Sequence, residues 1–181
     1  MKLHEYEAKL EQLDLVAQAV LAAEAEMREG YYVPEDLDDD ARNWEDRIVA
    51  MSQQITPQFV LTAIEDFKAL PVPTGMGETE QQRNLLELMY AETRIGFLMN
   101  VPGYSATLYN AMVDRVPSRM STEQVAEHVH QIRPIQLLLE ALPSLAKPGD
   151  DSDVKFVEMA LRYRDVVSQR IDKLEAFLKQ P

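Results

Sequence analysis

Carboxylate pairs separated by two residues are the clearest candidates for chemistry in this sequence. They occur in residues 26–29 (EMRE) and 35–38 (EDLD). Carboxylate oxygens are the ligands that Mg²⁺ prefers, but the ion requires them to be held rigidly in octahedral geometry. Only five residues separate the two pairs, and Pro34 places the second pair in a loop. We therefore expect a solvated acidic turn and no bound metal.

An alternative stays open, because all-α nucleotide pyrophosphatases hold magnesium with ExxE and ExxD pairs on facing helices. Under that alternative the chain is a Mg²⁺-dependent nucleotide pyrophosphohydrolase whose turnover depends on Glu26 and Glu29. The sequence contains no G-x-S-x-G motif, no dinucleotide fingerprint and no P-loop, since PTGMGET (73–79) lacks the lysine. The sequence therefore favours a protein with no catalytic residues and no cofactor.

Histidine and cysteine give little support for a metal site. The chain has no cysteine and three histidines, His4, His128 and His130. On a helix, residues two positions apart point about 200° away from each other, so His128 and His130 cannot bind one ion together. Because His128 shares a helical face with Val125 and Ile132, we expect it to be a partly buried core residue.

Glu92 interrupts a helical face that is otherwise apolar. The apolar residues of that face are Leu85, Leu88, Met89, Ile95 and Met99. A charge on a buried face is unfavourable unless it is paired. Arg94 cannot easily reach round the helix, so we expect a structural ion pair with Arg162 or Arg164 of the last helix.

The stretch YYVPEDLDDDARNWEDR (31–47) places seven carboxylates beside two tyrosines and the only tryptophan. One interpretation is an exposed loop and helix start whose acids cap the helix. The other is a surface that binds a basic or nucleic-acid-handling protein, because aromatic residues dominate binding hot spots and carboxylates steer basic partners or imitate DNA phosphates. The candidate binding residues are Tyr31, Tyr32, Glu35, Asp36, Asp38, Asp39, Asp40, Trp44, Glu45 and Asp46.

The net charge of −13 is concentrated near the N-terminus, where residues 1–54 hold 14 acids and 5 bases. Such acidity disfavours direct binding to nucleic acid and to anionic membranes. The sequence shows no apolar leader and no run long enough to span a bilayer. We therefore expect a cytoplasmic protein.

Residues 2–29 are expected to form one long helix with a heptad pattern, and Gly30 provides a stop signal. Its a and d positions are Leu3, Tyr6, Leu10, Leu13, Ala17, Val20, Glu24 and Met27. In the second half of the helix Val16, Leu21 and Ala23 widen this apolar stripe. A widened stripe suits a helix buried in a bundle, although it also permits a homodimer through the first helix. A third hypothesis for the whole chain is therefore a structural or oligomerisation module.

The remaining pattern predicts an all-α bundle of six to seven helices with a long N-terminal and a long C-terminal helix. Helices are expected to start among residues 38–40, at Thr56-Pro57, near 78, at 121–122 and at 154, with a further short helix through Leu108 and Met112. The helix near 78 is expected to end at NVPGYS, and Pro134 to kink or restart its helix. The Pro/Gly-rich residues 71–79 suggest a hinge between an acidic section (1–70) and a C-terminal bundle (80–181), unless the whole is one domain.

The segment ITPQFVLTAIEDFKALP (55–71) resembles the TPE-x-VLALLDELE-type segment of small accessory proteins from the early region of tailed bacteriophages and prophages. The resemblance implies a phage or mobile-element accessory factor acting in a bacterial host's cytoplasm. It supplies no catalytic residues. Together with the acidic N-terminal section, it leads to the hypothesis of a non-enzymatic protein that binds, and inhibits or modulates, a host or defence protein.

Overall fold

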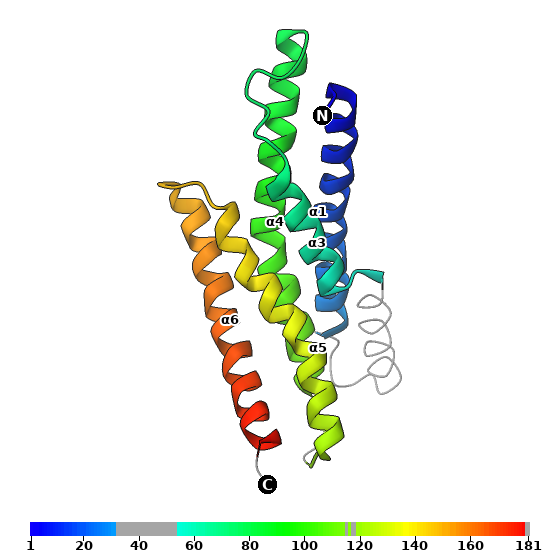
Figure 1. Cartoon of the computed structure of the whole chain (residues 1–181), viewed down its shortest axis with the longest axis vertical. Helices are drawn as coiled ribbons and strands as arrows, with labels where there is room; N and C mark the ends of the chain where they lie inside the picture. Colours follow the sequence, from blue (N-terminus) through cyan, green and yellow to red (C-terminus); the bar gives the residue numbers. More distant parts are fainter. Residues whose placement is uncertain (32–53, 115, 117–118, 180–181) are drawn as a thin grey trace.

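A computed structural model describes residues 1–31, 54–114, 116 and 119–179, and the regular secondary structure of these residues is all helical, with no strand. The elements are α1 (Leu3–Tyr31), α3 (Pro57–Ala69), α4 (Glu80–Asp114), α5 (Thr122–Ala141), the 3-10 helix η1 (Leu142–Leu145) and α6 (Asp151–Leu178) (Figure 1). The all-α prediction and its long terminal helices are therefore confirmed. The count of six to seven is not confirmed, because the described residues form five α-helices and one short 3-10 helix.

Two long helix pairs build the molecule, and α4 lies between α1 and α6 (Figure 1). Helices α1 and α4 run parallel, because Gln82 of α4 donates a hydrogen bond to Glu7 at 2.7 Å and Thr93 donates one to Asp14 at 3.3 Å. Helices α5 and α6 run antiparallel, since Gln136 donates to Ser168 while Arg133, earlier on α5, pairs with Glu175, later on α6. Short α3 packs against α5 and α1. One hydrophobic core joins all these helices.

The heptad stripe of α1 is buried as predicted, and it packs within the chain. Tyr6, Leu10, Ala17 and Val20 are all at most 3% exposed. A Cβ on Gly96 would lie 3.2 Å from the Ala17 Cβ, so these small residues let α1 and α4 approach closely. The stripe is covered by other helices of the same chain. A homodimer through α1 stays a prediction.

The start signals of α3 and α5 work as predicted, and that of α6 acts earlier than predicted. The Thr56 side chain accepts the Phe59 N–H at 3.1 Å, and Pro57 is the first helical residue of α3. Ser121 caps α5 in a reciprocal capping box with Gln124. Asp150 caps α6, which therefore begins three residues before the predicted position.

Two prolines lie inside helices, although Pro102 was expected at a helix end and Pro134 at a kink or restart. Helix α4 continues through Pro102 to Asp114, so the separate helix expected around 108–112 does not exist. Helix α5 continues through Pro134 without restarting. A proline removes one hydrogen bond of the helix, but tertiary packing can compensate. Around Pro102, buried Val101 and Tyr104 supply that packing, and the Tyr104 hydroxyl donates to the carbonyl of Ile55.

Residues 71–79 connect α3 to α4, and Gly75 and Gly77 adopt positive φ angles of 71° and 128° in this connection. The break in the helical pattern is therefore real, while the hinge and the domain division stay predictions. The helix expected to start among residues 38–40 lies outside the described residues. None of the described helices combines the length and apolarity needed to cross a bilayer.

Candidate binding surface

The predicted binding residues within 31–47 fall outside the part of the chain that the structure describes. Tyr31 is the last residue of α1, and its side chain is also outside the description. Both interpretations of this acidic stretch therefore stay predictions. The described helices do show two features that the sequence did not identify as sites. One is an exposed apolar stripe on α4, and the other is a polar pocket near the C-terminal end of that helix.

The prediction for Glu92 is wrong, because Glu92 is exposed and Arg94 is the buried charge of α4. Arg94 pairs with Asp153 at the start of α6 and donates to the Leu145 carbonyl at 3.0 Å. The Lys147 backbone N–H also donates to the Asp153 carboxylate, at 2.8 Å. The ion pair therefore fastens α4 to the connection before α6. The buried Arg94 Nε has no hydrogen-bond partner among the described residues, but Arg94 Nη1 and the Asp153 carboxylate are taken up by these structural contacts, which makes the ion pair a poor candidate for binding.

The buried face of α4 is not the one expected from the sequence. The buried apolar positions include Leu86, Phe97, Leu98 and Val101, whereas Leu85, Leu88, Ile95 and Met99 are 54%, 54%, 37% and 49% exposed. The latter four residues and Glu92 recur at alternating spacings of three and four residues, so they form one continuous stripe. We call these five residues the outer stripe. Phe59 of α3 is likewise an exposed large apolar residue, at 47%.

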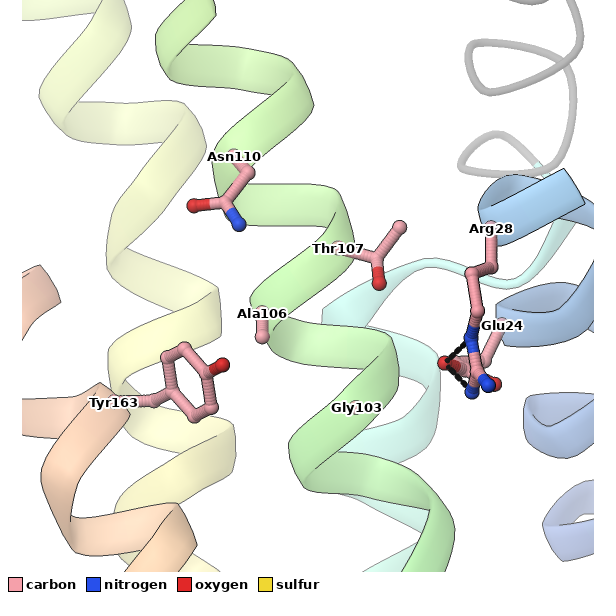
Figure 2. Close-up of a pocket in the computed structure, with 7 residues that line it drawn as sticks. All are labelled: Glu24, Arg28, Gly103, Ala106, Thr107, Asn110 and Tyr163. Carbon is pink, nitrogen blue, oxygen red and sulfur yellow. Dashed lines mark hydrogen bonds and ion pairs between the residues drawn. The ribbon is translucent and has the colours of Figure 1, made fainter. Parts of the chain in front are cut away.

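A polar pocket lies where the large side chains of the outer stripe end. Gly103, Ala106 and Asn110 each lie 18 residues, or about five helical turns, after Leu85, Leu88 and Glu92, so they continue the same face of α4. Their small or polar side chains leave space beside the helix. With Thr107 of α4, Glu24 and Arg28 of α1 and Tyr163 of α6, they line an open pocket of about 230 Å³ (Figure 2). We call this cavity the Glu24 pocket.

Glu24 is the only charged residue at the a and d positions of α1, and it is 5% exposed. One of its carboxylate oxygens accepts two N–H groups of Arg28, the Nε contact being 2.8 Å (Figure 2). A Cβ on Gly103 would lie 3.3 Å from that oxygen, so the glycine leaves room for the carboxylate. The sequence carried a signal for this pocket: a lone acid in an otherwise apolar stripe. The heptad pattern alone could not show what faces it.

His128 is buried as predicted, at 5% exposure, and no hydrogen-bond partner is present for its Nε2 among the described residues. It lines a second cavity of about 460 Å³ beside Met112, Met120 and Glu127. Burial lowers the pKa of His128 below its ordinary value of 6.5, and the positive charge of Arg170 lowers it further. The folded state therefore favours the neutral imidazole.

Replacing His128 by glutamine is expected to reduce the loss of stability on acidification. Because the pKa of His128 is lower in the folded than in the unfolded chain, its contribution to stability is complete above about pH 6.5 and declines as the pH falls towards the folded value. The free energy of unfolding of H128Q should fall less between pH 7 and 5 than that of the parent protein, measured by urea denaturation. Exposed His130 supplies the control: H130Q should keep the parental pH profile, and identical profiles for H128Q and H130Q would refute the assignment.

Metal-binding geometry is absent from the described helices, where no three His, Cys, Asp or Glu side chains gather in a way that could hold an ion. Glu26 is exposed on α1, while the side chain of Glu29 and residues 35–38 lie outside the description. The magnesium-dependent alternative therefore stays a prediction. No family model, no curated protein and no solved structure matches this chain.

Proposed function

We propose that this protein is a non-enzymatic accessory factor that binds another protein, and that the outer stripe is its docking surface for a basic amphipathic helix. The observation that carries the proposal is the exposure of Leu85, Leu88, Ile95 and Met99 in one helical register. Scattered exposed apolar residues need no explanation, but a contiguous apolar stripe on a helix is typical of an interaction site.

The spacing of the outer stripe suits a helical partner. Alternating steps of three and four residues are the spacing with which one helix presents side chains to another. A partner helix with apolar residues at i, i+3, i+4 and i+7 could lie along α4 and cover all four side chains. Such a partner would remove from water the surface that the fold leaves exposed.

Charge favours a basic partner over a second copy of this chain. Glu92 stands at the centre of the outer stripe, so two copies pairing through it would bring two carboxylates together in a desolvated interface. The neighbouring edge of α1 adds Glu7 and Asp14, which contact α4 through Gln82 and Thr93. With a net charge of −13, the chain attracts basic partners at long range.

The biological setting of the proposal comes from the resemblance of residues 55–71 to phage accessory segments. It supports a factor that inhibits or modulates a host or defence protein. The acidic residues 31–47 could extend the same basic-partner surface or imitate nucleic acid, and that part is a prediction from sequence.

A designed amphipathic peptide of leucine and lysine is expected to bind the protein with 1:1 stoichiometry, and the double variant Leu88→Asp/Ile95→Asp should lose at least about tenfold in affinity. The reason is that two carboxylates would replace two central apolar contacts. Isothermal titration calorimetry measures both affinities. A leucine–glutamate peptide of the same pattern should not bind.

The matched control is Leu15→Asp/Val72→Asp. It adds the same two negative charges at residues that lie outside the outer stripe and are 63% and 62% exposed. This control should bind the leucine–lysine peptide like the parent. Equal affinities of the two double variants would show that the peptide is held by net charge alone and would overturn the proposal. Sedimentation equilibrium provides a second check, since self-association abolished by the Leu88→Asp/Ile95→Asp change would make the stripe a homodimer surface instead.

A further inference from the structure

We infer that the Glu24 pocket is a guanidinium-binding site, which takes an arginine side chain from the partner helix that docks on the outer stripe. The inference rests on the proposed function for the source of the arginine, whereas the chemistry of the pocket stands on its own residues. Because the floor of the pocket continues the register of the outer stripe, a helix lying on that stripe would bring its next side chains over the pocket.

The pocket walls are rich in hydrogen-bond acceptors. Glu24 supplies a carboxylate that is nine-tenths buried, and Thr107, Asn110 and Tyr163 each carry an oxygen that can accept a hydrogen bond. A guanidinium group offers five N–H donors in one plane, which matches several acceptors around a single head group. The Tyr163 ring, which projects from α6 on the side opposite Glu24, adds an aromatic surface of the kind that attracts cations (Figure 2).

The size of the cavity also suits a head group. Its volume of about 230 Å³ is several times the roughly 30 Å³ that one water molecule occupies in the liquid. Gly103 and Ala106 create that space by the smallness of their side chains. Gly103 is not among the glycines with positive φ, so the helix backbone does not require glycine there. The glycine instead keeps α4 clear of the Glu24 carboxylate, which a Cβ would approach to 3.3 Å.

The structure already shows the Glu24 carboxylate holding a guanidinium. Arg28, one turn further along α1, places its Nε and one terminal nitrogen on the same carboxylate oxygen. The Arg28 side chain is 59% exposed, so its guanidinium lies at the solvent edge of the pocket, whereas the Glu24 side chain is only 7% exposed. A guanidinium delivered by a partner could therefore replace Arg28 while the carboxylate keeps its hydrogen bonds. In the free protein Arg28 acts as the internal occupant of the site.

Ethylguanidinium chloride is the probe that tests the pocket without any partner helix. Titrated at constant ionic strength, it should produce saturable NMR shifts at the amides of Glu24, Gly103 and Asn110 of the parent protein. Glu24→Gln should weaken this binding by about tenfold, the effect of losing a charged hydrogen-bond acceptor. Glu26→Gln, an exposed change on the same helix, should leave it unaltered.

The variant Arg28→Met shows whether the Glu24 pocket binds cations or anions. If the pocket binds guanidinium, removing the internal competitor should raise the affinity for ethylguanidinium several-fold. Circular dichroism of Arg28→Met checks that the variant keeps its helical fold. Inorganic phosphate serves as the opposite probe. Saturable phosphate binding at the same amides that Arg28→Met abolishes would overturn the inference, and so would the lack of any saturable ethylguanidinium shift in both the parent and Arg28→Met.

The docking proposal and the pocket proposal can each be refuted without refuting the other. Leu88→Asp/Ile95→Asp should lose the leucine–lysine peptide yet keep the parental response to ethylguanidinium, because the changed residues lie outside the pocket. Binding of ethylguanidinium without any peptide binding would refute the outer stripe and leave the pocket standing. Peptide binding without a response to ethylguanidinium would refute the pocket alone.

Discussion

Replacing Asp153 by alanine is expected to lower the free energy of unfolding by about 3–5 kcal/mol, the loss typical when one partner of a buried ion pair is removed. Arg94 and Asp153 are 5% and 3% exposed, so the variant leaves a buried guanidinium without its counter-charge. The Lys147 N–H loses its carboxylate acceptor as well. Urea denaturation followed by circular dichroism measures the change.

Asp151→Ala is the matched control, because Asp151 is an exposed acid in the same first turn of α6. It should lose only about 0.3–1 kcal/mol through the helix dipole. The double variant Arg94→Met/Asp153→Leu should be more stable than Asp153→Ala, since it removes the unpaired charge together with its partner. Similar losses for Asp153→Ala and Asp151→Ala would show that the ion pair does not hold α4 to α6.

Acidification gives an independent check on the same pair. Burial by itself raises the pKa of Asp153, but the hydrogen bonds from Arg94 and from the Lys147 backbone, with both positive charges, lower it overall. The folded pKa therefore lies below the unfolded one, so this stabilisation is present above about pH 4 and is lost as the pH falls through the folded value. The stability difference between the parent and Asp153→Ala should narrow in that acid range.

Replacing Phe67 by alanine is expected to cost about 3–5 kcal/mol, as is usual for large aromatic residues in a core. Phe67 is 1% exposed and connects short α3 to α4. Its ring stacks on Tyr90 with centroids 4.6 Å apart and meets Phe97 edge-on at 6.0 Å. Without this ring α3 would lose its principal aromatic contact with α4. Thermal or urea denaturation measures the loss.

Phe59 on the same helix supplies the control for Phe67. It is the same residue type but 47% exposed, so Phe59→Ala should change the unfolding free energy by only about 0.5 kcal/mol. The comparison removes any effect of helix propensity shared by the two substitutions. If both variants lost the same stability, the placement of Phe67 in the core would be wrong.

Local signals let the sequence predict where most helices begin. Thr56 followed by Pro57, Ser121 with Gln124, and Asp150 act on backbone groups within three residues, so their effect depends little on the rest of the chain. The buried stripe of α1 was also predictable, because its heptad pattern contains a single apolar face. The sequence could even have pointed to Glu24, the one acid within that stripe.

By itself, then, the sequence determined an all-α chain, its acidic character, the helix caps at Thr56 and Ser121, and the buried face of α1. Tertiary structure decided which side of α4 is buried, because that helix carries apolar residues on two faces and only its neighbours choose between them. It also carried helices through Pro102 and Pro134, where packing outweighs a lost hydrogen bond. The ion pair of Arg94 with Asp153 and the meeting of Glu24, Gly103 and Tyr163 join residues far apart in sequence, and only the folded chain brings them together.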